Sequence, residues 1–155
     1  MSMKYVIKNG GKKMKVTLSL VRGNATAYAE LYENKAPIAA AALFEILPVS
    51  SPVFHARWGG NEIWTSLKNL NNYAHENETC LPAPGDICIV PTGEKTYDLA
   101  IWYGTGWIFG PEFGFKPATV VGRITSNLKD FAIAANEVLT KGADEIVIRK
   151  VEAEE

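Results

Sequence analysis

The order of apolar and polar residues near the start of the chain is typical of β-strands. Val16, Leu18 and Leu20 alternate with polar residues, which is the two-residue period of a half-buried strand. The turn sequence Arg-Gly-Asn follows at 22–24, and a second alternation of the same kind runs over 27–32. We therefore predict that these two segments form a β-hairpin.

Two segments in the rest of the chain have the pattern of helices. Pro37 suits the first turn of a helix, and the Ala- and Leu-rich segment 37–47 follows until Pro48 prevents its continuation. Over 127–141, apolar residues recur on one helical face, and Gly142 is suited to end that helix. The sequence therefore predicts one short helix and one longer amphipathic helix.

Short apolar segments bounded by turn residues predict the remaining strands. They lie at 87–90, 99–103, 107–109, 119–124 and 145–151. Short connections favour antiparallel pairing of neighbouring strands, and about eight short strands favour a closed barrel. The prediction is a mainly β fold, a closed eight-stranded barrel with two helices that cap its open ends.

Composition limits the functions to consider. We expect residues 1–155 to form a single domain, because that length is enough to bury a hydrophobic core. The net charge of -1 gives no field that would attract nucleic acid, and no apolar run reaches membrane length. Two cysteines are too few for a disulfide framework. We expect a cytoplasmic protein that binds neither nucleic acid nor membrane, and the sequence leaves homo-oligomer formation open.

The segment 54–64 holds the densest group of reactive and aromatic residues in the chain. His55 can carry a proton, and the Arg57 guanidinium can form two parallel hydrogen bonds with a carboxylate or a planar ureido group. Two residues apart on a strand, they are expected to share one face. The alternative is a buried pair whose polar atoms are satisfied by backbone carbonyls or by Glu62.

All four tryptophans lie in the middle third of the chain, together with several other aromatic residues. They suit either the aromatic core of a small barrel or the apolar lining of a ligand pocket. For the pocket we predict six lining residues, His55, Arg57, Glu62, Trp64, Trp102 and Tyr103. The histidines and cysteines lack metal-ligand spacing, and no phosphate-binding loop or nucleophile elbow occurs, so we expect neither a metal nor a cofactor.

The order of several short motifs resembles the cyclophilin-like superfamily. The sequence Glu-Leu-Tyr-Glu-Asn-Lys-Ala-Pro at 30–37 leads into the first helix, as the acidic-x-x-Ala-Pro turn of cyclophilins does. The segments 84–91 and 100–104 resemble shorter bacterial cyclophilin-like proteins, and 55–64 is similar to an uncharacterised bacterial branch of that superfamily. Over residues 12–151, the resemblance implies an eight-stranded barrel with a helix at each end.

The same resemblance argues against prolyl isomerase activity. Prolyl isomerases have an arginine directly after a Phe-His pair, whereas here Ala56 follows His55 and the arginine is displaced to position 57. In a strand, a shift of one residue turns the side chain to the opposite face. Those enzymes also have a glutamine-rich segment, and this chain contains no glutamine. We therefore predict a barrel without isomerase activity.

Two classes of function are consistent with these residues. The first is a barrel that binds a small polar or anionic metabolite, or a partner enzyme, in a cleft lined by arginine, histidine and tryptophan. The alternative is an enzyme or accessory subunit that acts on a small amide, ureide or carboxylate compound, because cyclophilin-like domains resembling this one occur in amide- and urea-cleaving enzymes. The sequence shows no obvious nucleophile or metal site, which favours binding.

Overall fold

The protein is described from a computed structural model that covers residues 13–110, 112 and 114–152. Its elements in chain order are β1 (Lys15–Leu20), β2 (Ala25–Leu31), α1 (Pro37–Glu45), β3 (Val49–His55), η1 (Arg57–Gly59), β4 (Gly60–Leu67), β5 (Glu78–Thr79), β6 (Asp86–Gly93), β7 (Thr96–Gly106), β8 (Phe109–Gly110), β9 (Gly114–Phe115), β10 (Ala118–Ser126), α2 (Leu128–Lys141) and β11 (Asp144–Lys150).

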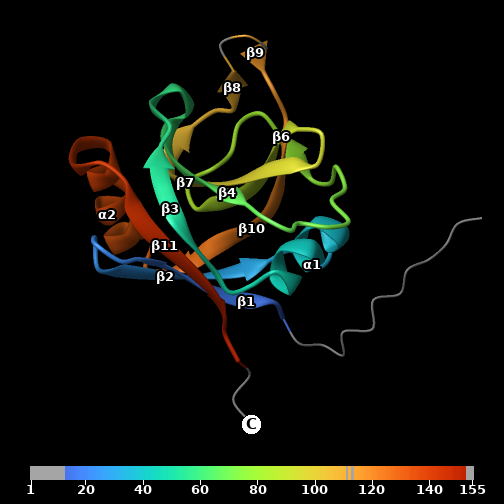
Figure 1. Cartoon of the computed structure of the whole chain (residues 1–155), viewed down its shortest axis with the longest axis horizontal. Coiled ribbons are helices and arrows are strands. Elements are labelled where there is room, and N and C mark those ends of the chain that lie inside the picture. The colour runs from blue at the N-terminus through green and yellow to red at the C-terminus, as the bar shows by residue number, and fades with distance from the viewer. Residues whose placement is uncertain (1–12, 111, 113, 153–155) are drawn as a thin grey trace, which may run out of the picture.

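Eight antiparallel strands close into a barrel (Figure 1). Their order is β2-β1-β11-β3-β4-β7-β6-β10, and the pairing of β10 with β2 closes the ring. The short strand β5 adds to β10, and β8 and β9 form a separate hairpin. This architecture confirms the predicted mainly β fold, a closed eight-stranded barrel with two helices.

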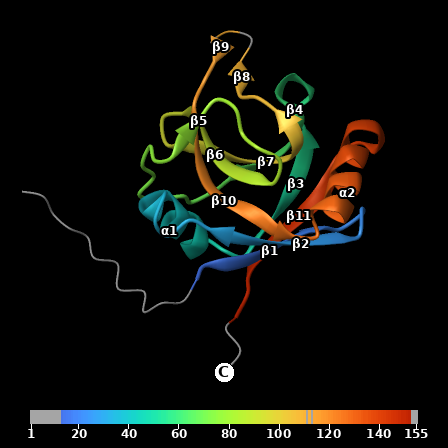
Figure 2. The ribbon, with the colours of Figure 1, turned by 180° about the vertical axis from the view of Figure 1, so that it is seen from behind.

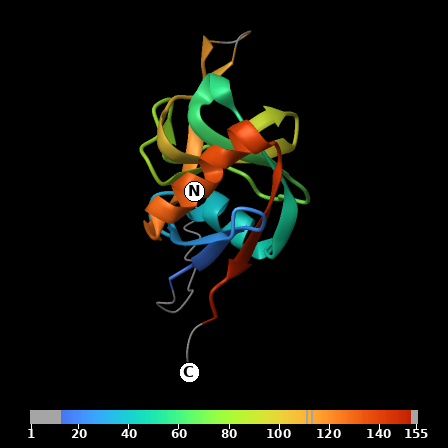
Figure 3. The ribbon, with the colours of Figure 1, turned by 90° about the vertical axis from the view of Figure 1, so that its left-hand side faces the viewer.

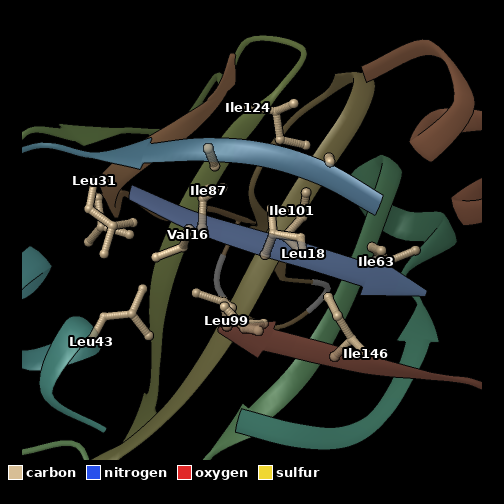
Figure 4. Packing of buried hydrophobic residues seen from close by; sticks show 14 of the residues in the cluster. Val16, Leu18, Leu31, Leu43, Ile63, Ile87, Leu99, Ile101, Ile124 and Ile146 are labelled. Carbon is tan, nitrogen blue, oxygen red and sulfur yellow. The ribbon is translucent and has the colours of Figure 1, made fainter. Parts of the chain in front are cut away.

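One apolar core fills the barrel, because alternate residues of each strand point inward (Figure 4). Val16 and Leu18 of β1 belong to the same cluster as Ile63 of β4, Ile87 of β6 and Ile101 of β7. All five side chains are almost completely buried. Each burial of this kind stabilises the folded state by roughly 1.5–3 kcal/mol.

The two helices lie on opposite sides of the barrel (Figures 1 and 2). Ala40 and Leu43 of α1 and Phe131 and Ala135 of α2 are buried in the same core cluster as the strands. Figure 3 looks onto α2 and shows the β8–β9 hairpin projecting from the far end of the molecule. None of the described helices is long and apolar enough to span a membrane.

Strand β7 is buried on both of its faces. Leu99 and Ile101 point into the barrel core, whereas Ala100 and Trp102 belong to a second apolar cluster that also contains Ile108. Because successive residues point to opposite faces, the second cluster lies on the outside of the barrel. Burial on both faces explains why the sequence of this strand is a continuous apolar run without a two-residue period.

Arg57 does not share a strand face with His55, contrary to the expectation from their spacing. β3 ends at His55, and Arg57–Gly59 forms a turn of 3-10 helix in which the arginine is exposed. Gly60 follows with φ of 84°, in the region that favours glycine. The chain therefore reverses here into β4, and the two-residue period ends before it reaches the arginine.

Candidate functional site

A groove lies on the outer face of the barrel, where β4, β7 and β6 run side by side. Trp64 of β4 pairs with Ala100 of β7, which pairs on its other side with Cys88 of β6. The groove has a volume of about 290 Å³, at the lower end of the range for ligand pockets. Its lining includes Trp58, Glu62, Trp64, Asp98, Ile108 and Phe109.

The groove has aromatic walls and a small residue at its floor. Ala100 lies between Trp64 and Cys88, and its single methyl group leaves space that a larger side chain would fill. Trp64 packs against Phe54 with ring centroids 5.2 Å apart, and Trp58 is 54% exposed. The indole nitrogen of Trp64 is buried without a hydrogen-bond partner among the described residues. The walls therefore suit a flat apolar ligand.

Glu62 places a buried carboxyl group on this groove. Its side chain is 9% exposed, and none of the described residues supplies a hydrogen bond or a positive charge that would favour its ionised form. Burial penalises the charged form and Asp98 adds repulsion, so the pKa of Glu62 is raised to about 8. At neutral pH the carboxyl group is therefore mainly protonated, and it ionises only slightly above neutral pH.

Gly59 makes room for that carboxyl group. A Cβ atom at position 59 would overlap Oε1 of Glu62 and lie 3.3 Å from the carbonyl oxygen of Trp107. The Gly59 carbonyl oxygen accepts hydrogen bonds from Nε1 of Trp102 at 3.1 Å and from the backbone N–H of Trp107 at 3.0 Å. Trp102 is fully buried, so its indole fixes the turn beside Glu62 and is not part of the groove lining.

Asp98 is a second carboxyl group on the groove. It lies two residues before Ala100 and hence on the same face of β7. Burial raises the pKa of Asp98, and a hydrogen bond from Ser66 partly opposes that shift. Lys116 also lines the groove, but its ammonium group donates a hydrogen bond to the Pro91 carbonyl oxygen at 2.5 Å. The groove thus has two acidic groups and one lysine whose position is already fixed.

His55 and Tyr103 form a separate polar group on the inner side of the sheet. His55 Nε2 and the Tyr103 hydroxyl are 2.6 Å apart, and that hydroxyl donates to Oδ1 of Asn136 on α2 at 3.3 Å. Nδ1 of His55 is buried without a partner among the described residues. Burial, with the Arg57 charge, lowers the pKa of His55. The histidine is therefore neutral at physiological pH and links the barrel to α2.

The structure does not bring the six predicted site residues into one cleft. Glu62 and Trp64 line the groove, and Trp102 is buried beside it. His55 and Tyr103 bond to each other at a different place, and the exposed arginine on η1 is not part of the groove lining. The prediction placed Arg57 on a strand with His55, whereas it lies on η1, and it did not separate the two faces of the sheet.

Ten of the twelve residues that line the groove were not among the predicted site residues, and Asp98, Ile108 and Lys116 belong to these ten. Asp98 is followed at two-residue spacing by Ala100 and Trp102, which was the available signal that all three share a face. Ile108 and Lys116 reach the groove because the β8–β9 hairpin brings the segments on either side of it over the sheet. That contact joins segments through tertiary structure, and no local pattern indicates it.

Solved structures with a similar fold include those of McbB and of the hypothetical protein AF2241. The structure of McbB in complex with tryptophan is 21% identical with a TM-score of 0.67, and the match covers 90% of this chain and 46% of the McbB chain. This chain therefore spans about half the length of McbB. The solution structure of the hypothetical protein AF2241 from Archaeoglobus fulgidus is 20% identical with a TM-score of 0.62, and the match covers 92% of this chain and 99% of AF2241. At these identities the likeness concerns the fold alone.

Sequence comparisons give the family. A comparison with curated proteins gives no match. Residues 18–149 match a family described as protein of unknown function, DUF3830. That description does not mention cyclophilins, so the resemblance to their superfamily stays a prediction. Because the match spans most of the sequence, the chain belongs to the DUF3830 family.

Proposed function

We propose that this barrel binds a small molecule with a flat apolar part in the groove on the outer face of β4, β7 and β6. The observation that carries the proposal is the pair of polar groups on this aromatic groove, the Glu62 carboxyl group, which is 9% exposed, and the Trp64 indole nitrogen, which is buried without a hydrogen-bond partner among the described residues. Buried polar groups are usually hydrogen-bonded, because leaving one unpaired costs free energy. A ligand that accepts a hydrogen bond from the Trp64 indole nitrogen would recover that cost, and the Glu62 carboxyl group offers it a second bond.

The similar fold of McbB supports a ligand of this size. McbB was solved in complex with tryptophan, a small molecule with a flat indole ring and polar groups at one end. A groove of about 290 Å³ with Trp58 and Trp64 in its lining has the size and walls for a ring of that kind. The low identity to McbB gives no correspondence of individual residues, so the support concerns ligand size and shape.

A second candidate function is the sequence-based alternative, an enzyme or accessory subunit that acts on a small amide, ureide or carboxylate. The observation that favours it is the Glu62 pKa of about 8. A carboxyl group that titrates near neutral pH can both give and take a proton, as general acid–base catalysis requires. Hydrolysis of benzamide or phenylurea by the purified protein, absent in Glu62→Gln, would support this alternative.

The sequence-based proposal also includes an anion site at His55 and Arg57, in which the Arg57 guanidinium binds a carboxylate and His55 carries a proton. We call this site the anion clamp. The exposed Arg57 side chain is available to an anion, whereas His55 already bonds to Tyr103. Titration of 3-phenylpropanoate into wild type and Arg57→Ala separates the two locations. If the clamp is correct, the arginine variant loses carboxylate binding. If the groove alone binds, the variant keeps the wild-type affinities.

The first test of the groove is ligand binding followed by tryptophan fluorescence and thermal unfolding. The probes are 2-phenylethylamine, 2-phenylethanol and 3-phenylpropanoate, which share one flat ring. A bound probe is expected to raise the melting temperature, because it binds only the native state.

Two exposed tryptophans supply matched variants for this test. Trp58 is 54% exposed and lines the groove, whereas Trp107 is 41% exposed and does not line it. We expect Trp58→Ala to weaken probe binding by about tenfold through loss of the aromatic wall, and Trp107→Ala to leave it unchanged. Equal effects of the two changes, or no binding of any probe to the wild type, would contradict the proposed groove.

A further inference from the structure

The charges on the groove indicate the chemical class of its ligand. Glu62 on β4 and Asp98 on β7 both line the groove. The charge of Asp98 contributes to the raised pKa of Glu62, so the two carboxyl groups are close enough to repel each other. The one lysine in the lining, Lys116, directs its ammonium group to the Pro91 carbonyl oxygen. The two carboxyl groups therefore face the groove, and the ammonium group of Lys116 bonds to a carbonyl oxygen and to neither of them.

The register of the strands shows how the acidic groups and the aromatic wall are arranged. Glu62 pairs with Trp102, Trp64 pairs with Ala100, and Asp98 pairs with the residue two places beyond Trp64. The aromatic wall and the alanine floor consequently lie between the two acidic positions. A ring lying over Ala100 would have a carboxyl group toward each end.

We infer that the groove takes an organic cation, a protonated amine on a flat apolar body, with its ammonium group beside Glu62 and with Asp98 adding to the negative potential. The inference rests on the proposed function and specifies its ligand. Three kinds of interaction support it: a charge-assisted hydrogen bond to the carboxylate, attraction of the ammonium group by the tryptophan faces, and burial of the ring against the apolar wall.

Other ligand classes fit the groove less well. An anion would gain no charge-assisted bond from the two acidic side chains, and each of them would repel it once ionised, which for Glu62 occurs at about pH 8. A metal ion would need more ligands, since the described residues contain no group of three or more His, Cys, Asp or Glu suited to hold one. A neutral alcohol would keep the ring contacts but would lose the charge assistance.

Binding of a cation to Glu62 is coupled to release of its proton. The titratable and charged groups around it are Asp98 on β7, Cys88 on β6, Lys116 after β9 and the exposed Arg57 on η1. Because the pKa of Glu62 is about 8 in the free protein, an amine that requires the carboxylate must displace the proton at lower pH. Amine affinity should therefore rise as the pH increases toward 8, whereas alcohol affinity should not change.

Matched probes test the inference by isothermal titration calorimetry at about pH 8. 2-Phenylethylamine, 2-phenylethanol and 3-phenylpropanoate share the ring but carry a cation, a neutral group and an anion. We expect the amine to bind about tenfold more tightly than the alcohol and the carboxylate to bind most weakly. If the alcohol or the carboxylate binds as tightly as the amine, the inference is wrong but the groove proposal stands. If none of the three binds, both fail.

Isosteric variants locate the charge that selects the amine. Glu62→Gln is expected to weaken amine binding about tenfold and to change alcohol binding by less than about twofold. Asp98→Asn is expected to have a smaller effect in the same direction, because Asp98 acts on the ammonium group through the electrostatic potential of the groove and not through a direct hydrogen bond. Glu45→Gln, at an exposed carboxylate on α1, is the matched control and should bind like the wild type. Thermal unfolding checks that each variant is folded, and equal loss of amine and alcohol affinity in the Glu62 variant would overturn the inference.

Discussion

At the scale of single residues, Glu62 differs from most carboxyl groups because burial disfavours its ionised form and no hydrogen bond or positive charge from the described residues offsets that penalty. Asp144 gives the contrast within the same chain. Backbone N–H groups of Arg22, Gly23 and Glu145 donate to the Asp144 carboxylate, and these bonds hold its pKa below the usual range. Glu62 receives no such bond from the described residues. The first carboxylate therefore stabilises a turn, whereas the second retains the capacity to bond to a ligand.

The raised pKa of Glu62 predicts how the stability of the protein depends on pH. The folded state holds this proton up to about pH 8, whereas in the unfolded chain it is lost near the ordinary value of 4.5. The contribution of this proton to stability is thus complete below pH 4.5, decreases as the pH rises above that value, and is lost once the pH has passed through 8. Relative to Glu62→Gln, the free energy of unfolding of the wild type should fall by roughly 3–5 kcal/mol between about pH 4 and about pH 9.

Urea denaturation of both proteins at several pH values measures this difference. Comparison with Glu62→Gln cancels the titration of most other groups, since the two proteins share them. Glu45→Gln should follow the wild type at every pH, because that carboxylate is exposed. A wild-type curve that runs parallel to the Glu62→Gln curve over the whole range would show that the carboxyl group is not buried in solution.

At the scale of elements, the η1 turn positions the Glu62 carboxyl group. The backbone N–H of Ala56 donates to the Glu62 carbonyl oxygen at 2.9 Å, and that of Gly59 donates to the Ala56 carbonyl oxygen at 2.9 Å. Trp102 anchors the same turn from β7 through its bond to Gly59. The turn, the start of β4 and the middle of β7 therefore form one unit around the carboxyl group.

Gly59→Ala tests this unit. The added methyl group would overlap Oε1 of Glu62, so either the carboxyl group or the turn must move. We expect a loss of roughly 1–3 kcal/mol in the free energy of unfolding and weaker binding of 2-phenylethylamine. In a Glu62→Ala background the overlap is absent, and the same change at position 59 should cost much less. Additive effects of the two changes in urea denaturation would mean that the glycine and the carboxyl group do not interact.

At the scale of the whole molecule, local patterns predicted the barrel but not the faces of its strands. The alternation over β1 and β2 and the amphipathic pattern of α2 are properties of neighbouring residues, and each element formed close to its predicted place. β7 has no such period, because both of its faces are buried. The sequence therefore could not show that Tyr103 points inward and Trp102 outward, and the predicted site combined residues from both sides of one sheet.

The position of Arg57 was the other part that the sequence could not give. Spacing alone predicted that it shares a face with His55, and this holds only if the strand continues. The two glycines at 59–60 allow the chain to turn, and the hydrogen bond from the Trp107 backbone N–H to the Gly59 carbonyl oxygen stabilises that path only in the folded sheet. Segments distant in the sequence thus decide where β3 ends.

The last prediction concerns prolyl isomerase activity and follows from the arrangement of the whole barrel. Among the described residues, Arg57, His55 and Trp102 do not lie together in one cleft, because the arginine lies on an exposed turn and Trp102 is buried on the outer face. His55 is committed to Tyr103 on the inner side. We therefore expect the protein to leave cis–trans exchange in a proline test peptide at its uncatalysed rate, with a time constant of tens to hundreds of seconds at about 25 °C. A protease-coupled assay with an authentic cyclophilin as positive control measures this, and acceleration comparable to that control would show that a catalytic pocket exists elsewhere on the barrel.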